Sequence, residues 1–363
     1  MLVTVERVRI PRSIDSDDAA DFIGFVDVGN DCALHLWRSD DFVHDAADEL
    51  SWYGDSPFQL RMLYLARVDG EPAARVLVTV PLDPASTTAE LDVRVIPAAR
   101  RHGIGTALLQ QGEDLVADAG RIEISMFSEH PAAGIRSRPD HESVDGNDDG
   151  SGDGPELPRD EAVGFARHHG YRLGQVQLMS RLALPLDADR RTRLLEDAAA
   201  RSHGYTVRTW FGRCPDALVE GYALAASRMS TDAPHDGLVM DATPWDARRV
   251  REMEQRAIGR GRPRLTTAAL SGDGRLVGYS ELEVVDASRV AEQRDTIVLP
   301  EHRGHGLGLL MKIANLDRLA AAAPGTTGVI TWTVEDNGAM RAINDALGFQ
   351  MIALIGDWQK SIG

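Results

Sequence analysis

The sequence has few of the features that mark secreted or membrane proteins. It holds only two cysteines, Cys32 and Cys214, in 363 residues, which excludes a disulfide framework and fits a reducing cytoplasm. No apolar run approaches the ~20 residues of a membrane span. The first residues carry acids where a secretory signal would have its apolar core. We therefore expect a cytoplasmic protein without a membrane partner.

Basic residues are in the minority, because 39 lysines and arginines stand against 56 acids and give a formal net charge of −17. Nucleic-acid binding by counterion release needs a basic surface, so no nucleic-acid partner is expected. An acidic surface instead favours solubility and attracts small cations. The histidines are scattered and no spacing typical of a zinc site occurs, so no metal is expected. The length fits two domains at roughly 150 residues each.

An internal repeat divides the sequence into two related halves. Residues 91–109, LDVRVIPAARRHGIGTALL, and residues 294–312, RDTIVLPEHRGHGLGLLMK, align without a gap. The matched residues are Pro97 with Pro300, Arg100 with Arg303, Gly103 with Gly306, and Gly105 with Gly308. A second pair of similar segments follows the two copies, at residues 169–171 (HGY) and 347–349 (LGF). The repeat predicts one fold that occurs twice.

The first half is about 25 residues longer between these landmarks than the second. Residues 130–160 are rich in Asp, Glu, Gly, Pro and Ser, so burial cannot offset their ordering entropy. We interpret them as a flexible, acidic surface insertion. It is either a plain solvated loop or a functional segment, acting as a lid or as an electrostatic attractor for a cationic substrate. Residues 185–204 are typical of a charged linker helix, between an N-terminal domain over 1–184 and a C-terminal domain over 205–363.

The order of the expected elements is clearest in the second half. Strand patterns occupy 205–210, 266–270, 276–285, 295–300, 329–334 and 350–359. Helix patterns occupy 215–229, 247–259, 307–321 and 337–347. This alternation predicts an α/β or α+β domain with a mixed sheet, occurring twice.

The repeated segment consists of a strand, an Arg-x-x-Gly-x-Gly loop and a helix with an apolar face. Its two glycines let the backbone turn sharply and approach a ligand closely. Free N–H groups of the loop and the helix start then point to one place, where the helix dipole favours negative charge. Such a nest suits a pyrophosphate. The spacing is neither that of the dinucleotide-binding glycine motif nor that of the Gly-Lys-Ser/Thr phosphate loop.

This segment resembles the acyl-CoA loop of the GNAT-type N-acetyltransferases. Val-x-Pro precedes the Arg-x-x-Gly-x-Gly loop, and the stretch from Asn337 to Phe349 resembles the next helix and strand of that family. The resemblance covers most of both halves. It implies two GNAT-like domains of α/β (α+β) fold, each a mixed, mostly antiparallel sheet flanked by helices. It also implies acetyl-CoA as the cosubstrate.

The resemblance implies which groups hold acetyl-CoA. Backbone groups of the strand would bind the pantetheine arm, because strand edges carry unused hydrogen bonds, and loop N–H groups would bind the pyrophosphate. In the second half these residues are Thr296, Ile297, Val298, Arg303, Gly304, His305, Gly306, Leu307, Gly308 and Leu309, with Asn337 as a pantetheine ligand. In the first half they are Val93, Arg94, Val95, Arg100, Arg101, His102, Gly103, Ile104, Gly105 and Thr106. Lys312 is a further candidate for positive charge near the phosphates.

Acetyl transfer to an amine needs a base, because an ammonium group with a pKa near ~10 is not a nucleophile. Glu292, eleven residues before Arg303, matches the place where several family members carry a catalytic Glu, and Asp295 is the other candidate. Their odd spacing puts these two on opposite sides of a strand unless a bulge intervenes. Glu281 and Glu283 share one face of the preceding strand and are candidates for the acceptor site.

The proton donor to the leaving thiolate departs from the family pattern. The usual Tyr lies four residues before the Gly of the Gly-Phe pair, where the second half has Asn344 and the first half has Ala166. Neither residue supplies a phenol proton. Asn344 remains a candidate hydrogen-bond partner of the thiolate, with water as the proton source, and the departure leaves open whether one half is inactive.

The second half is favoured as the catalytic one, because it has Asn337 where the first half has Arg159 at the same spacing. The leading hypothesis is an acyl-CoA-dependent N-acetyltransferase in which a small, cationic amine attacks directly in a ternary complex. No Ser–His or Cys–His pair in the sequence suggests a covalent intermediate. The alternatives are a non-catalytic acyl-CoA-binding sensor or scaffold and, third, acetylation of protein or peptide N-termini. Both a monomer and a homodimer are compatible with the sequence.

Overall fold

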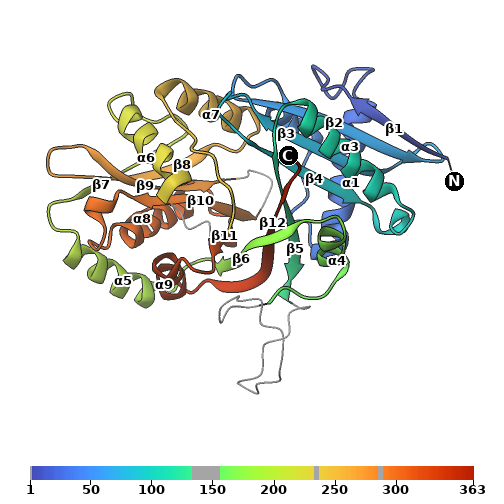
Figure 1. Ribbon diagram of the computed structural model, residues 1–363. Coiled ribbons are helices and arrows are strands. Elements are labelled where there is room, and N and C mark those ends of the chain that lie inside the picture. Colours follow the sequence, from blue (N-terminus) through green and yellow to red (C-terminus); the bar gives the residue numbers. More distant parts are fainter. Residues whose placement is uncertain (1, 133–155, 233–236, 285–288) are drawn as a thin grey trace.

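The computed structural model describes residues 2–132, 156–232, 237–284 and 289–363 (Figure 1). The strands of the first half are β1 (Val3–Val8), β2 (Gln59–Val68), β3 (Glu71–Pro81), β4 (Thr88–Val95), β5 (Glu123–Pro131) and β6 (Arg172–Ala183). Its helices are α1 (Ala20–Trp37), α2 (Ala46–Tyr53), α3 (Ile104–Asp118) and α4 (Glu161–His168), and α5 (Ala188–Arg201) follows them.

The second half repeats this order. Its strands are β7 (Thr206–Phe211), β8 (Arg264–Leu270), β9 (Leu276–Glu283), β10 (Val290–Val298), β11 (Gly328–Val334) and β12 (Gln350–Ser361). Its helices are α6 (Val219–Asp232), α7 (Ala247–Gly259), α8 (Leu307–Ala322) and α9 (Gly338–Leu347). Each element predicted for this half has a counterpart here, and the largest difference is β10, which begins five residues before the predicted strand.

The described strands form one twelve-stranded sheet in the order β1-β2-β3-β4-β5-β12-β6-β11-β10-β9-β8-β7. Two neighbouring pairs are parallel, β4 with β5 and β10 with β11, and the other pairs are antiparallel. Helices cover both faces (Figure 1). This mixed, mostly antiparallel sheet flanked by helices confirms the predicted fold class.

The strand that ends each half pairs with the other half. β12 lies between β5 and β6, and β6 lies between β12 and β11. Figure 1 shows β12 in dark red beside β5 and β6 at the centre of the molecule. The two halves therefore share a continuous sheet, although the domain boundaries at 184 and 205 stay a prediction.

The two faces of the sheet bury different cores. In the second half, Leu282 packs with α8, whereas Tyr279 packs with α6 and α7 on the other face. All eight residues of β9 are buried, as expected for a strand covered on both faces. In the part of the chain that the structure describes, no helix has both the length and the apolar character needed to cross a membrane.

A segment of the second half reaches the first half at the start of β4. Asp241, between α6 and α7, accepts hydrogen bonds from the N–H groups of Thr87 and Thr88 and from the hydroxyls of Ser86, Thr87 and Thr88, mostly at 2.8–3.0 Å. Burial alone would raise the pKa of Asp241, but the hydrogen bonds from Ser86 and Thr88 lower it to about 2. The carboxylate is therefore a charged clasp between the halves.

A second contact joins α2 to α7. Arg256 on α7 donates to the backbone carbonyls of Ser51, Trp52 and Gly54 at 3.0–3.2 Å, at the C-terminal end of α2. A cation at this end satisfies carbonyls that the helix leaves free.

The predicted acidic insertion at about 130–160 falls largely outside the described residues. Its ends belong to regular elements, because residues 130–131 close β5 and Asp160 is the N-cap of α4. The Asp160 carboxylate accepts from the N–H groups of Ala162 and Val163 at 3.0 Å. The segment predicted as a linker helix holds α5.

Candidate active site

Each half turns from strand to helix through a glycine loop with two residues in the left-handed region. They are Gly304 (φ +85°) and Gly306 (φ +69°) in the second half, and Arg101 (φ +64°) and Gly103 (φ +80°) in the first. Glycine adopts this region freely, whereas a residue with a Cβ loses roughly 1 kcal/mol. The following helices leave their first N–H groups without intrahelical partners, as an anion-binding site requires.

The arginine that opens each loop folds back onto the preceding strand. Arg303 Nε donates to the Val298 carbonyl at 3.0 Å, and Arg100 Nε donates to the Val95 carbonyl at 3.2 Å. Arg303 also pairs with Asp232 at 3.0 Å. Both arginines therefore brace the turn, and the Arg303 side chain is 52% exposed.

The strand before each loop leaves its parallel neighbour after a few residues. β10 pairs with β11 only at residues 290–292, and β4 pairs with β5 only at residues 88–90. Beyond these pairs the strands diverge, and their facing edges keep unused backbone hydrogen-bonding groups. We call the opening between β4 and β5 the first wedge and that between β10 and β11 the second wedge. Such an edge can accept an extended segment as an added strand.

The second wedge has a β-bulge, whereas β4 pairs with β3 without a register shift. Gln293 pairs with Leu282 and Thr296 pairs with Ser280, so β10 has one more residue between these pairs than β9 has. The Gln293 side chain holds the bulge, because its amide nitrogen donates to the Glu281 carbonyl at 2.6 Å. One strand bordering the second wedge is therefore bent and re-aimed, as bulged strands near active sites often are.

The bulge brings both candidate bases to one face of the sheet. Glu292 lies opposite Glu283 in the antiparallel pair, so the two side chains share a face. Asp295 accepts a hydrogen bond from the Tyr279 hydroxyl on that same face at 3.4 Å. Regular alternation would have separated Glu292 from Asp295. With Glu281, all four candidate acids lie on the face opposite α8.

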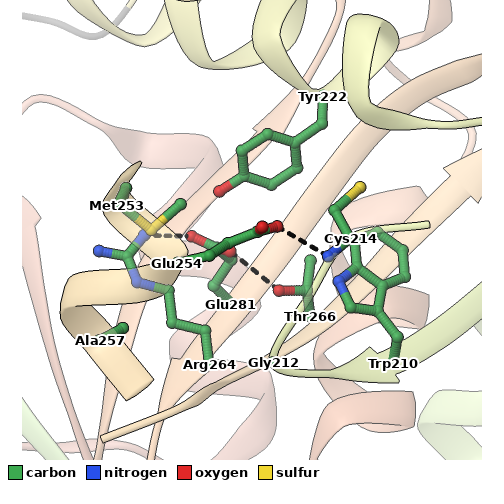
Figure 2. Close-up of a pocket in the computed structure, with 10 residues that line it drawn as sticks. All are labelled: Trp210, Gly212, Cys214, Tyr222, Met253, Glu254, Ala257, Arg264, Thr266 and Glu281. Carbon is green, nitrogen blue, oxygen red and sulfur yellow. Dashed lines mark hydrogen bonds and ion pairs between the residues drawn. The ribbon is translucent and has the colours of Figure 1, made fainter. Parts of the chain in front are cut away.

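A narrow pocket on this face surrounds Glu281 (Figure 2). Glu281 is 1% exposed and accepts from Arg264 at 2.8 Å and from the Thr266 hydroxyl at 2.9 Å. Figure 2 shows the Tyr222 hydroxyl pointing to the side of the pocket where this carboxylate lies. Burial raises the pKa of Tyr222, so its hydroxyl keeps its proton. Glu281 is thus engaged in an internal network.

Arginines also surround Glu283. Three guanidinium groups lie within 4.0 Å of its carboxylate, and they belong to Arg260, Arg262 and Arg294. Arg294 contacts Glu292 as well, at 3.3 Å. Asp295 makes no ion pair with any residue that the structure describes. Of the four candidate acids, Asp295 is therefore the one left without a cationic partner.

Asn344 belongs to a buried polar chain on the other face. Lys312 Nζ on α8 donates to Asn344 Oδ1 at 2.8 Å, and Asn344 Nδ2 donates to the Thr333 hydroxyl on β11 at 2.9 Å. The Lys312 side chain is 2% exposed. Its ammonium therefore contacts α9, and through Asn344 it is linked to β11.

Asn337 is the N-cap of α9, and its side-chain oxygen accepts from the Met340 N–H at 3.1 Å. The N-cap of the corresponding helix α4 is Asp160, next to the Arg159 that spacing had matched to Asn337. Both helices therefore start on a side-chain cap, and the amide of Asn337 remains a prediction as a pantetheine ligand.

An ion pair spans the first wedge. Arg94 on β4 donates to Glu129 on β5 at 2.6 Å and to Asp92 at 2.6 Å. The position aligned with Arg94 in the second half is Ile297, which cannot form such a bridge. A group passing through the first wedge would have to break this hydrogen-bonded pair.

The first half also contains a Ser–His–Asp chain that the sequence did not suggest. Ser128 Oγ lies 2.7 Å from His130 Nε2, and His130 Nδ1 lies 2.6 Å from the Asp160 carboxylate. Trp358 Nε1 donates to the same Ser128 oxygen at 2.8 Å. Ser128 and His130 are buried, so the chain ties β12 to β5 and α4 and presents no accessible nucleophile.

Cys32 and Cys214 are buried free thiols. No group of three or more His, Cys, Asp or Glu side chains converges in a metal-binding arrangement within the described ranges.

Comparison with known proteins identifies the repeat. The family model described as "Acetyltransferase (GNAT) family" matches residues 32–135 and 231–349, once in each half. The chain belongs to the GNAT acetyltransferase family. The predicted resemblance is therefore confirmed, and the two wedges lie at corresponding places in the two GNAT repeats. A search of curated proteins found no match.

Several solved structures have a similar fold. A tandem GNAT protein from the clavulanic acid biosynthesis pathway, without acetyl-CoA, is 24% identical with a TM-score of 0.71, and the match covers 100% of this chain and 99% of that one. A GCN5-related N-acetyltransferase from Sphaerobacter thermophilus is 17% identical with a TM-score of 0.62, over 99% and 96%. A glucosamine N-acetyltransferase region of a fungal multi-domain GH3 β-N-acetylglucosaminidase is 14% identical with a TM-score of 0.59, over 99% of this chain and 38% of that one.

Besides the Ser128–His130–Asp160 chain, three features of this GNAT protein were not predicted from the sequence: the bulge on β10, the Arg94–Glu129 bridge and the buried Lys312–Asn344 pair. The first two depend on pairing between strands and leave no local pattern. Lys312 did leave a signal, because it aligns with Leu109 in the first half and puts a charge on an otherwise apolar helix face.

Proposed function

We propose that this GNAT protein transfers the acetyl group of acetyl-CoA to the amine of a small molecule, and that the second half carries the reaction. The observation that supports this most is the second wedge, where the bulged strand β10 leaves β11 directly before the glycine loop. The loop residues 303–309 would hold the pyrophosphate, and the backbone of residues 296–298 the pantetheine arm. The thioester would then reach the bulge, with α8 on one face and the candidate acids on the other.

The first half would bind acyl-CoA without turnover or serve as a scaffold. It keeps the glycine loop, but β4 has no bulge and the Arg94–Glu129 pair lies across the first wedge. Breaking this partly buried, hydrogen-bonded ion pair would cost free energy, because each charge would lose its partner. An acetyl group would therefore not cross from one face of the sheet to the other in this half.

We assign the acceptor side of the reaction to Asp295. It lies at the bulge, it is exposed, and it has no ion pair among the described residues, whereas Glu292 shares Arg294 with Glu283. Asp295 would take the proton of the bound ammonium, directly or through water, so that the neutral amine attacks the thioester carbonyl carbon. Transfer would be direct, because the Ser128–His130 pair is buried in the other half.

The acceptor would be a small, cationic amine. The net charge of −17 attracts cations, and Asp295 gives that attraction a local anchor. Glu281 and Glu283 remain proposals as acceptor ligands, because their arginine partners would have to move aside. No nucleic-acid or membrane partner is proposed, the protein would act in the cytoplasm, and it would be a monomer or a homodimer.

The test measures CoA release from acetyl-CoA with a panel of small amines. We expect Asp295→Asn to lower kcat about 100-fold with little change in the KM for acetyl-CoA, because only proton removal is lost. Glu292→Gln is the matched control and should stay within about threefold of the wild type. A wild-type protein that binds acetyl-CoA in calorimetry but releases no CoA with any amine would instead support the sensor or scaffold function.

A further inference from the structure

The second half lacks the phenol that its family uses to protonate the leaving thiolate, and another acid lies close to that place. We propose that Lys312, held by Asn344, donates the proton to the sulfur of CoA as the thioester breaks. The inference rests on the proposed function and assigns its missing acid.

The position of Lys312 supports this role. Gly308 and Lys312 are one helical turn apart on α8, so they share a face. A Cβ at Gly308 would lie 3.1 Å from a side chain of α9 and 4.0 Å from Thr296 on β10, so this face points into the gap between β10 and α9. From that face Lys312 reaches Asn344, whose amide reaches Thr333 in the part of β11 that has left β10. The ammonium therefore lies at the inner end of the second wedge, where the thioester would end.

The surroundings of Lys312 make it a proton donor. Its Nζ contacts Asn344 and lies 5.6 Å from the centre of the Phe349 ring, and no carboxylate among the described residues is within ion-pair distance. Arg341 and Asp345, the charged groups of α9 nearest to it, line an outer depression with Asn344. Burial alone lowers the pKa of Lys312 to about 7. Since a free thiol has a pKa near ~8.5, proton transfer from this ammonium to a thiolate is favourable.

Composition and the internal repeat both single out this lysine. Of the 39 basic residues, only Lys312 and Lys360 are lysines. An arginine stays protonated in proteins and cannot donate, whereas a buried lysine can. In the first half, Leu109 aligns with Lys312 and Ala166 with Asn344, and both belong to the apolar core. The same fold therefore packs without a charge here, so packing does not require Lys312.

The step balances without another reactant. The amine nitrogen bonds to the carbonyl carbon, the carbon–sulfur bond breaks, and its electron pair remains on sulfur. The sulfur takes a proton from Lys312 Nζ, and the amine proton leaves through Asp295 to water. The neutral Nζ then regains a proton from water, for which the depression of about 200 Å³ beside Asn344 offers an approach.

The two lysines allow a direct test by NMR of protein labelled with ¹³C at lysine Cε, because the spectrum has one signal from Lys312 and one from Lys360. In the free protein we expect the Lys312 signal to titrate near pH 7. At pH 9, above the pKa near ~8.5 of the free thiol, saturating CoA should raise the fraction of Lys312 that is protonated, because a neighbouring thiolate favours the ammonium. CoA in which hydrogen replaces the thiol, and the Lys360 signal throughout, serve as the controls and should show no such change.

If CoA binds but the titration of the Lys312 signal does not change, the inference is overturned and the proposed function remains intact. Absence of CoA binding would overturn both.

Kinetics of two variants provide a second test: Lys312→Leu, which reproduces the packing of the first half, and Lys312→Arg. Each should lower kcat about 100-fold. Each should also remove the loss of kcat above pH 7 that deprotonation of Lys312 causes in the wild type. Their KM for acetyl-CoA should stay within about threefold. Unchanged kcat and pH profiles in both variants would equally contradict the role, and the wild-type NMR experiment remains decisive if a variant fails to fold.

Discussion

Lys312 and Leu109 occupy aligned places on the two glycine-loop helices, yet their burial has opposite energetic consequences. Burying a leucine contributes about 1.5–3 kcal/mol. Burying an ammonium removes hydration that one amide and one aromatic face replace only in part. The second half therefore carries a destabilising charge that the first half avoids, which is typical of positions where chemistry and not packing determines the residue.

Replacing Lys312 by leucine is expected to stabilise the protein most at low pH. Burial lowers the pKa of Lys312 from 10.5 to about 7, so between these values the unfolded state binds more protons than the folded state. Wild-type stability therefore rises with pH across this window, and the penalty of the buried ammonium is complete below pH 7. The pH-dependent part of the gain in Lys312→Leu should be about 4–5 kcal/mol.

Urea unfolding at pH 6, 8 and 10 measures this gain, with Lys360→Arg as the control that should show no such trend. The difference between Lys312→Leu and the wild type should shrink steadily as pH rises. A difference that is constant over this range would contradict a buried, titrating lysine.

The site residues differ in whether their conformation is fixed by near neighbours in the sequence or by residues far along the chain. The glycine loop and the position of Asn344 could be predicted, because each depends on neighbours a few residues away. The orientation of Asp295 could not be, because the bulge depends on Gln293 bonding across to β9. The Arg94–Glu129 bridge joins residues 35 apart, and no local pattern marks it.

At the scale of elements, β10 and α7 mark the two limits of prediction. Helix α7 was predicted at its observed bounds, because Asp246 caps it and its apolar period is unbroken. The prediction of β10 missed the strand before the bulge, because the extra residue breaks the two-residue alternation on which strand prediction depends. The missed part includes the three pairs with β11 that close the second wedge.

The clasp between residues 237–246 and the start of β4 should contribute a measurable share of stability. Asp241→Asn keeps the size of the side chain but removes the charge. Because solvent screens this partly exposed carboxylate, we expect a loss of only about 1 kcal/mol in the free energy of unfolding at pH 7. The lowered pKa of Asp241 makes this contribution complete above pH 4, and it is lost as pH falls from about 4 toward 2.

Urea unfolding of the wild type and Asp241→Asn at pH 7 and pH 3 tests the clasp. The difference between the two proteins should fall by about half at pH 3. Equal stabilities at pH 7 would mean that the carboxylate is not needed to join the halves at this point.

For the whole molecule, the arrangement of the two halves depends on β6 and β12. The last strand of each half pairs with strands of the other half. The repeat predicted two similar domains, but it contains no information about which half receives each final strand, because pairing between distant strands has no local signal. The result is one sheet in which two GNAT repeats share their central strands. The repeats then diverge in their wedges, where an ion pair spans the first and a bulge with a buried lysine characterises the second.

The central claim is that acetyl transfer takes place in the second half, and matched glycine variants test it most directly. Gly308 and Gly105 each stand in the first turn of the helix after the loop, where a glutamate places negative charge and bulk at the phosphate site. We would measure CoA release from acetyl-CoA with the amine panel, after checking that each variant melts like the wild type. Gly308→Glu should reduce the rate at least 100-fold and Gly105→Glu less than about threefold. The reverse pattern, or full activity in Gly308→Glu, would contradict the account.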